Sequence, residues 1–335
     1  MKKAVVVDAD YGSVSRAELN TMQENLKKEG IDLQLHHCVS EDAIIEAAAE
    51  ASVIICTGNP PITRKVMSAL PQLKVVIRMG IGVNSVDLDA ATELGKVALF
   101  MPGFCINELA VHATALAMAL NRNILYYDKG IRAGKWPKAT YYLPKAPKDM
   151  VLGLYGFGGS AKELYKIFHD GFGSKVITCD PYAQKGNYDV TFVDFDTLLA
   201  ESDILSIHAP LLPETYHIFS TDAFRKMKSS ATIINISRGG LIDQEALADA
   251  LDQGEIRFAG LDVFEQEPLP VNSRLIERDD VALTCHSAFY GEDSKACQLA
   301  WAFEMTCQAL NEGKVQAQKV ANRPILKQNT GFTFV

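Results

Sequence analysis

Short apolar segments alternate along most of the chain with longer segments of helical periodicity. The short segments are rich in Val and Ile, which is typical of strands, and several are apolar at every position, as in sheets buried on both faces. The longer segments place apolar residues three or four positions apart, as a helix with one buried face requires. This alternation predicts β-α-β units and parallel sheets. Predicted strands are 5–7, 53–55, 75–77, 151–154, 176–177, 204–207, 232–236 and 281–283, and predicted helices include 41–50, 160–169 and 244–251.

Two strongly apolar helices are expected to join two domains. Residues 108–120 are rich in Ala and Leu and apolar nearly all round, which favours a buried connector over a surface helix. Residues 297–310 form a similar stretch near the end of the chain and would make the return connection. We therefore expect one α/β domain formed by residues 1–102 and 292–335, with a second domain, residues 103–291, inserted into it.

Length and composition support a globular protein. The chain has 335 residues, against roughly 100 to 200 per domain, and 48% of them are hydrophobic and 22% charged. The 33 basic and 41 acidic residues give a net charge of −8 without a dense Lys/Arg block, which argues against a nucleic-acid binder. No apolar run approaches the ~20 residues that span a bilayer, and the start of the chain does not resemble a signal peptide, so we expect no membrane partner and a cytoplasmic location.

Cysteine usage favours neither disulfides nor a metal centre. The seven cysteines are odd in number, widely spaced and without a Cys-x-x-Cys pair. Disulfide frameworks and zinc sites normally use paired, closely spaced cysteines. We therefore expect reduced, mostly buried thiols and no metal.

A glycine-rich segment after the predicted strand at 151–154 has the pattern of a dinucleotide site. Gly156, Gly158 and Ala161 follow that strand at the spacing Gly-x-Gly-x-x-Ala and precede a helix. The first glycine permits a tight turn, the second lets the backbone approach a pyrophosphate, and the small alanine lets the helix pack closely on the strand. N–H groups at the start of the helix would face the phosphates. The segment predicts a Rossmann-type doubly wound parallel sheet.

Asp180, at the end of the next predicted strand, indicates which dinucleotide binds. It follows Gly158 by 22 residues, where a carboxylate can accept hydrogen bonds from the adenosine ribose hydroxyls. The 2′-phosphate of NADP would meet like charge at this position. We therefore expect NAD as the cofactor, although Lys185 is near enough in sequence to soften the discrimination.

Three polar residues follow further predicted strands in the order Arg238, Glu267 and His286. The carboxyl ends of strands in such a sheet are where ligands bind. Redox chemistry on a hydroxy acid needs a cation for the substrate, an acid/base group, and a carboxylate that orients the acid/base group. Arg, His and Glu meet these needs, and their occurrence in order after a dinucleotide pattern favours a dehydrogenase.

Several motifs together resemble the D-isomer-specific 2-hydroxyacid dehydrogenases. They are the glycine pattern with Asp180 and the segments 78–87, 206–215, 235–243, 260–268 and 286–290. The resemblance covers nearly the whole chain, and the His-x-Ala-Phe-Tyr ending is similar to D-lactate dehydrogenases. It implies a smaller, flavodoxin-like α/β substrate domain (1–102 and 292–335) that carries an inserted NAD-binding Rossmann domain (103–291).

The resemblance also implies an activity and a set of site residues. The activity is NAD-dependent interconversion of a small 2-oxo acid and its D-2-hydroxy acid by hydride transfer. Arg238 would bind the 2-oxo acid, His286 would exchange a proton with the carbonyl oxygen, and Glu267 would support the protonated imidazole. Cofactor contacts would come from Gly156, Gly158, Gly159, Ser160, Asp180, Pro210, Thr215, Ile236 and Asp262, the last at the carboxamide. Substrate contacts would come from Gly80, Ile81, Gly82 and Tyr290, with loop N–H groups of 80–82 on the carboxylate.

An aromatic segment suggests how the protein assembles. Residues 121–150 carry Tyr126, Tyr127, Trp136, Tyr141 and Tyr142 among Lys, Gly and Pro. Such an arm can wrap its own chain or a second subunit, because aromatic side chains are enriched at interfaces. Together with the resemblance, the arm favours a homodimer formed through the inserted domain.

The chain departs from the family pattern at two positions. Val111 precedes His112 where Glu is common, and Asn84 replaces a frequent Asp. Neither change removes a catalytic group.

An NAD(H)-sensing binding protein, resembling the C-terminal binding protein corepressors, is the alternative to an enzyme. Within the enzymes, a short phosphoglycerate dehydrogenase, a hydroxypyruvate enzyme and a glyoxylate enzyme all remain, whereas a formate dehydrogenase would have Gln in place of Glu267.

Overall fold

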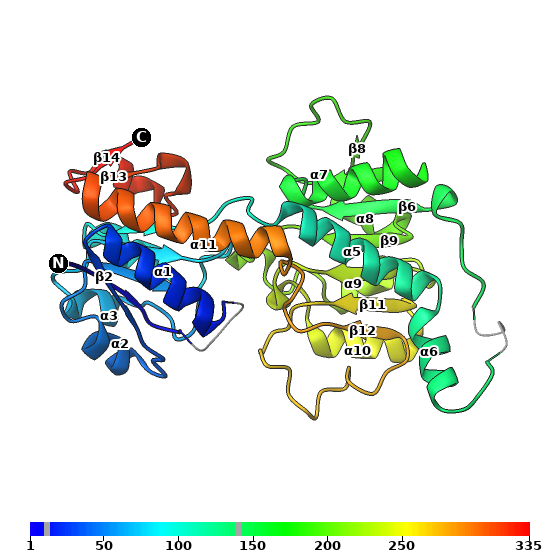
Figure 1. Ribbon diagram of the computed structural model, residues 1–335. Coiled ribbons are helices and arrows are strands. Elements are labelled where there is room, and N and C mark those ends of the chain that lie inside the picture. The colour runs from blue at the N-terminus through cyan, green and yellow to red at the C-terminus, as the bar shows by residue number, and fades with distance from the viewer. Residues whose placement is uncertain (10–13, 138–141) are drawn as a thin grey trace. The chain divides into compact units, whose positions relative to one another are not determined.

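The computed structural model describes residues 1–9, 14–137 and 142–335, which form two compact units (Figure 1). The first unit is Met1–Phe104 with Tyr290–Val335, and the second is Cys105–Phe289. The second unit is therefore an insertion into the first. Each unit is built on a parallel sheet with helices on both faces, so the predicted α/β class is confirmed.

The sheet of the first unit has five parallel strands in the order β2-β1-β3-β4-β5. This is the flavodoxin-like order, which reverses direction between β1 and β3. The predicted strands at 5–7, 53–55 and 75–77 correspond to three of these five. The strands are β1 Lys2–Val6, β2 Ile31–Leu35, β3 Val53–Cys56, β4 Val75–Arg78 and β5 Val97–Leu99.

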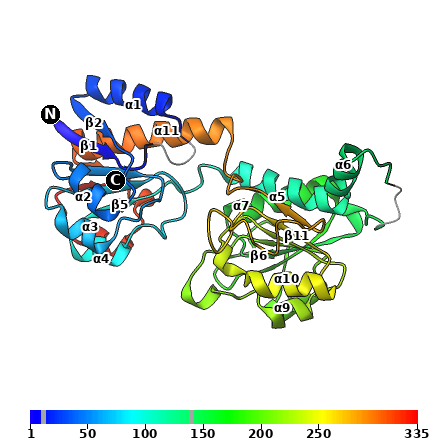
Figure 2. The same ribbon diagram turned by 90° about the horizontal axis from the view of Figure 1, so that it is seen from below.

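Helices cover both faces of this sheet because its strands are apolar on both faces. Val53 and Ile55 pack in the core beneath α1 and α11, whereas Ile54 and Cys56 pack in the core beneath α2, α3 and α4. Figure 2 shows the two helix layers on opposite sides of the sheet. The helices are α1 Arg16–Lys28, α2 Glu41–Ala47, α3 Arg64–Ala69, α4 Leu88–Glu93 and α11 Glu292–Cys307, and a two-stranded ladder of β13 Lys314–Val315 and β14 Thr333–Phe334 lies near the C-terminus.

The sheet of the second unit has seven parallel strands in the order β12-β11-β10-β9-β6-β7-β8. This is the doubly wound Rossmann order, with its reversal between β6 and β9. Ligands bind outside the carboxyl ends of the strands at such a reversal. The strands are β6 Val151–Tyr155, β7 Lys175–Cys179, β8 Thr191–Phe192, β9 Ile204–Ile207, β10 Thr232–Asn235, β11 Phe258–Leu261 and β12 Val281–Leu283.

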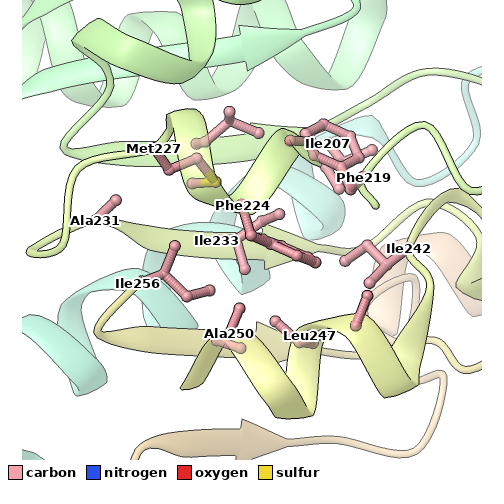
Figure 3. Close-up of a cluster of buried hydrophobic side chains, with 14 of the residues drawn as sticks. Ile207, Phe219, Phe224, Met227, Ala231, Ile233, Ile242, Leu247, Ala250 and Ile256 are labelled. Carbon is pink, nitrogen blue, oxygen red and sulfur yellow. The ribbon is translucent and has the colours of Figure 1, made fainter. Parts of the chain in front are cut away.

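Two apolar cores hold the helices of the second unit on its sheet. Helices α5 and α7 pack on one face, where Ala113, Ala161 and Leu164 are almost fully buried. Helices α8, α9 and α10 pack on the other, where Phe224 and Leu247 meet β-strand side chains (Figure 3). The helices are α5 Ile106–Asn121, α6 Ile124–Arg132, α7 Gly159–Tyr165, α8 Phe195–Glu201, α9 Thr221–Lys226 and α10 Gln244–Gln253.

Helix α5 and the aromatic arm differ in part from the expectations. Helix α5 buries one face on the sheet, but Val111 on the other face is 57% exposed, so the helix is not buried all round. The arm contains helix α6, none of whose residues is buried, and Trp136 is 85% exposed. Tyr142 instead packs on Phe258 of its own unit, and Tyr141 lies outside the described residues. None of the helices in the described residues has the length and apolar character needed to cross a membrane.

Candidate functional site

The glycine-rich turn joins β6 to α7 at the reversal of the seven-stranded sheet. Gly156 has φ of 93°, and a Cβ there would lie 3.0 Å from backbone atoms of His208 and Ala209, so the turn requires glycine. Gly158 caps α7, and no described atom beyond its two chain neighbours would lie within 4 Å of a Cβ at that position. The turn is thus packed against the end of β9 on one side and open at Gly158, as the approach of a pyrophosphate requires.

Asp180, which follows β7, ties this turn to the next loop. One carboxylate oxygen accepts the N–H of Phe157 at 2.8 Å, and the other accepts the N–H groups of Tyr182 and Ala183 at 2.8 and 3.0 Å. A carboxylate has about four lone-pair sites. Three bonds therefore leave acceptor capacity on Asp180 for a further donor such as a ribose hydroxyl.

A cavity of about 540 Å³ lies beside Asp180. Its volume is within the range of small-ligand pockets, roughly 300–1,000 Å³. Most of the lining is aromatic or aliphatic, which suits a flat apolar ring such as a nucleotide base. The lining residues are Tyr155, Cys179, Asp180, Pro181, Phe192, Val193, Asp194, Phe195 and Ile218.

His208, just after β9, braces the start of helix α7. Its Nδ1 lies 2.9 Å from Oγ of Ser160, and its Nε2 lies 2.9 Å from Oγ of Ser206. Burial lowers the pKa of His208 to about 3, so the ring is neutral at physiological pH. A neutral imidazole donates from one nitrogen and accepts at the other, and both are used here.

Further predicted cofactor residues lie in the loops after β9 and β10 and at the start of α7. Thr215 Oγ1 donates to the carbonyl of Pro210 at 2.9 Å and accepts the N–H of Leu212 at 2.8 Å, which closes the loop after β9. The side chain of Ile236 is 6% exposed and packs in the core. Gly159, the first residue of α7, leaves room for Ile106, whose Cδ1 would lie 2.7 Å from a Cβ at position 159.

His286 and Glu267 form a hydrogen-bonded pair at the carboxyl edge of the same sheet. Nδ1 of His286 lies 2.7 Å from Oε2 of Glu267, and the N–H of Phe264 donates to Oε1 at 3.0 Å. Burial opposes ionisation of Glu267, but the bond to His286, the Phe264 N–H and the charge of Arg238 outweigh it and hold the pKa of Glu267 below its usual range. Glu267 is therefore a carboxylate at neutral pH.

Arg238 is brought beside this pair by a turn after β10. The Asn235 side chain closes the turn, donating to the carbonyl of Arg238 at 2.9 Å and accepting the N–H of Ser237 at 3.0 Å. A Cβ at Gly239 would lie 1.9 Å from the carbonyl carbon of Phe264, so glycine is required for the two loops to touch. This contact explains how Arg238 comes close enough to act on the charge of Glu267.

Asp262, after β11, is fully buried and organises the loop that bears His286. One of its oxygens accepts the Thr284 hydroxyl at 2.6 Å and the Ser287 N–H at 2.8 Å, and the other accepts the Ala288 N–H at 2.8 Å. Its carbonyl accepts the N–H of His286 at 2.7 Å. His286 has φ of 53°, a left-handed conformation that costs a non-glycine residue of order 1–3 kcal/mol. The bonds to Asp262 hold the loop in this conformation.

The predicted substrate residues Gly80, Ile81, Gly82 and Tyr290 lie in the first unit. The N–H of Gly80 is already bonded to the carbonyl of Arg78, at 2.8 Å. In the described part of the chain, the N–H groups of Ile81 and Gly82 find no protein acceptor. Tyr290 is 56% exposed, and the Lys295 ammonium lies 5.3 Å from its ring centre.

The structure thus joins the predicted residues of the second unit into two neighbourhoods. One contains the glycine turn and Asp180, and the other contains Arg238, Glu267 and His286. Sequence reasoning missed the supporting roles of Asn235, Gly239 and His208, and it missed Thr284 and His112 altogether as site residues. For His112, the only indication in the sequence was that a single histidine stands within the apolar segment 108–120.

The fold and these two neighbourhoods, one with a glycine turn and one with a hydrogen-bonded His–Glu pair, are typical of a dinucleotide-binding oxidoreductase. Residues 114–288 match the family model described as D-isomer specific 2-hydroxyacid dehydrogenase, NAD binding domain. The chain belongs to the D-isomer specific 2-hydroxyacid dehydrogenase family, as expected from its motifs.

Individual relatives and structures agree with this assignment. The chain is 31% identical to glyoxylate reductase of Korarchaeum cryptofilum, covering 88% of this chain and 90% of that protein. It is 36% identical to chloroplastic D-3-phosphoglycerate dehydrogenase 2 of Arabidopsis thaliana over 84% of this chain, but it spans only 45% of that protein's length. The crystal structure of a glyoxylate reductase from Paecilomyes thermophila superposes with a TM-score of 0.82 at 27% identity, covering 93% of this chain and 96% of that chain.

Proposed function

We propose that the protein is an NAD-dependent dehydrogenase that interconverts a small 2-oxo acid and its D-2-hydroxy acid. The observation that carries the proposal is the 2.7 Å pair of His286 and Glu267 next to Arg238, in the unit that matches an NAD binding domain. The family membership favours this enzyme over an NAD(H)-sensing binding protein.

His286 would be the acid/base residue. Its Nδ1 faces the Glu267 carboxylate, so Nε2 is the nitrogen that would give a proton to the carbonyl oxygen of the 2-oxo acid and take one back in oxidation. Glu267, ionised at neutral pH, would orient the ring and stabilise its protonated form.

The second unit offers groups that fit NAD. Gly158 and the start of α7 would face the pyrophosphate, Asp180 would accept from the ribose hydroxyls, and the apolar cavity beside it would take the adenine. Bound NAD(H) supplies or accepts the hydride. Pro210, Thr215, Ile236 and Asp262 stay predicted cofactor contacts.

Arg238 and the loop at residues 80–82 stay predicted substrate contacts, each described within its own unit. The planar guanidinium of Arg238 can bind a carboxylate and a neighbouring carbonyl oxygen together. The N–H groups of Ile81 and Gly82 stay the predicted contacts of the carboxylate, since successive N–H groups without protein acceptors in the described part of the chain favour an anion.

Glyoxylate and hydroxypyruvate are the first substrates to test. Oxidation of NADH would be followed with glyoxylate, hydroxypyruvate, pyruvate, 2-oxoisocaproate, phenylpyruvate and 3-phosphohydroxypyruvate. The glyoxylate reductase relative, which this chain matches over nearly its whole length, favours the smallest acids. If the protein binds NADH but reduces none of these acids, the result would favour the NAD(H)-sensing binding protein over the enzyme.

A homodimer formed through the second unit is the proposed assembly. Ile124, Leu125 and Ile131 on α6 are between 42% and 53% exposed, which is unusual for three apolar residues on one short helix. Light scattering at micromolar concentration is expected to give twice the chain mass of 36.7 kDa. A single species of 36.7 kDa would exclude this assembly.

A further inference from the structure

Helix α5 touches the acid/base loop through His112, a residue to which neither the glycine pattern nor the Arg–Glu–His set assigns a role. Nε2 of His112 lies 2.9 Å from Oγ1 of Thr284, and Thr284 follows β12 two residues before His286. The His112 side chain is 22% exposed, so the contact is largely shielded from water. A histidine that reaches from one helix to a catalytic loop can set the position of that loop.

The direction of the hydrogen bonds defines the proton on His112. The Thr284 hydroxyl donates its one proton to Oδ1 of Asp262, at 2.6 Å. Thr284 Oγ1 must therefore accept in its contact with His112, which places a hydrogen on Nε2 of His112. The same Nε2 lies 3.6 Å from Oδ1 of Asp262, so the donor also faces a carboxylate with no exposed surface.

Asp262 passes this constraint on to His286. Its two oxygens hold the N–H groups of Ser287 and Ala288, and its carbonyl holds the N–H of His286. The backbone of His286 is left-handed, a conformation that persists only where its surroundings enforce it. The chain of contacts runs from His112 through Thr284 and Asp262 to the residue that carries the acid/base group.

We propose that His112 and Thr284 are positioning residues that fix the His286 loop through Asp262. The proposal rests on the proposed dehydrogenase activity for its kinetic readout. His112 neither donates a proton to substrate nor binds it, and its effect is to keep His286 in register with Glu267. Loss of the contact displaces His286, and a displacement of about 1 Å is enough to slow chemistry markedly.

The kinetic experiment compares variants that remove or keep the hydroxyl. Thr284→Val, which preserves shape, is expected to lower kcat about 10-fold with little change in KM for the 2-oxo acid. Thr284→Ser restores the hydroxyl and is expected to recover most of the turnover. His112→Leu in the Thr284→Val background is expected to add almost nothing, because both changes break one chain of contacts.

Thr114→Val is the matched control on α5. It is the same hydroxyl-to-methyl change, and the Thr114 hydroxyl donates only to Ala110 of its own helix, at 2.8 Å. We expect wild-type kcat for this variant. If Thr114→Val lowers kcat as much as Thr284→Val, the effect belongs to the stability of the unit and the proposal is wrong.

A spectroscopic experiment decides the proposal independently of any turnover. The chain has seven histidines, so labelling with histidine carrying ¹³C at Cε1 gives seven resonances, which single variants assign. Thr284→Val is expected to move the resonances of both His112 and His286, whereas Thr114→Val moves neither. An unmoved His286 resonance would overturn the proposal, even if kcat fell. If the wild-type protein turns over none of the acids, the proposed function is wrong, but the histidine resonances still test whether His112 and Thr284 position the His286 loop.

Discussion

Each of the two sheets has one point where the strand order reverses. The residues at these two points differ: a buried carboxylate lies at one and an open glycine turn at the other. In the first unit, Asp8 and the loop after β3 meet at the reversal, where an oxygen of Asp8 accepts the N–H and hydroxyl of Thr57 and the N–H of Gly58 at 2.6 to 3.1 Å. Asp8 is 2% exposed. In the second unit, the turn at Gly156 packs on the end of β9 but is open at Gly158.

The contrast separates what topology provides from what side chains decide. Parallel strands that diverge leave a crevice at either reversal. A buried carboxylate already occupies the loop N–H groups of the first unit, and burial raises the pKa of Asp8 despite the bonds from Thr57 and Gly58. Glycines without side chains keep the second crevice available to an anion. The same fold rule thus yields a structural contact in one unit and an open crevice in the other.

The largest expected effect tests whether His286, in the second unit, supplies the proton. His286→Ala removes the proton donor, and general acid/base catalysis is typically worth about 10²- to 10⁴-fold. We expect kcat to fall by that factor while the Kd for NADH, measured by fluorescence titration, stays within about twofold. His169→Ala, at a histidine stacked on Tyr165, is the control and should keep normal turnover. Near-normal turnover of His286→Ala would mean that another group supplies the proton.

The next prediction distinguishes the two glycines of the open crevice. Gly158→Val should fold normally, because the position is open, but should weaken NADH binding roughly 10-fold or more, about 1.4 kcal/mol. Gly156→Val should instead lower stability by roughly 1–3 kcal/mol through overpacking against His208 and Ala209. Calorimetry and NADH titration on both variants check this. If a folded Gly158→Val variant binds NADH with unchanged affinity, the pyrophosphate does not bind at this turn.

A matched pair of substitutions compares the two reversal points directly. Asp8→Ala removes the acceptor of the partly buried N–H groups of Thr57 and Gly58, which costs up to about 1–3 kcal/mol for each group and should lower the midpoint of thermal unfolding without altering NADH affinity. Asp180→Ala frees an N–H group on Tyr182, which is 85% exposed and open to water, so it should cost less stability than Asp8→Ala; it should also narrow the preference for NADH over NADPH about 10-fold. Equal turnover of the unmodified protein with both cofactors would reject the assignment of Asp180.

Periodicity predicted most of the fold because the central strands are apolar on both faces. Val53 to Cys56 and Ile204 to Ile207 are buried at every position, so their pattern is unambiguous. Strands such as β8 and β13 have only two residues and leave no such pattern. Helix α6 was not expected, because its apolar residues remain exposed and so do not follow a core.

The candidate site was predictable where residue type alone carries the chemistry, and not where geometry does. Arg238, Glu267 and His286 stood out as ionisable groups after strands. The bond between His112 and Thr284 joins residues 172 positions apart, and no local pattern announces it. The complete burial of Asp262 is likewise a consequence of how the loops pack, although the residue itself was picked out as a cofactor contact.

The smallest expected effect concerns His208, which bonds Ser160 at the start of α7 to Ser206 on β9. Its folded pKa of about 3 is below the unfolded value of about 6.5, so the unfolded chain takes up the proton first as pH falls. The stability that His208 contributes is therefore complete above pH ~6.5 and is lost progressively towards pH ~3. Gln at this position does not titrate but can donate to one serine and accept from the other.

Acidification from pH 7.5 to 5 should consequently destabilise the wild-type protein more than His208→Gln, by about 2 kcal/mol, or a few degrees in the unfolding midpoint. His169→Gln, at a partly exposed histidine of the same unit, provides the control and should follow the wild type. Parallel midpoints for wild type and His208→Gln across this range would mean that the ring between Ser160 and Ser206 takes up its proton without unfolding, and that the crevice is braced by packing rather than by a neutral histidine.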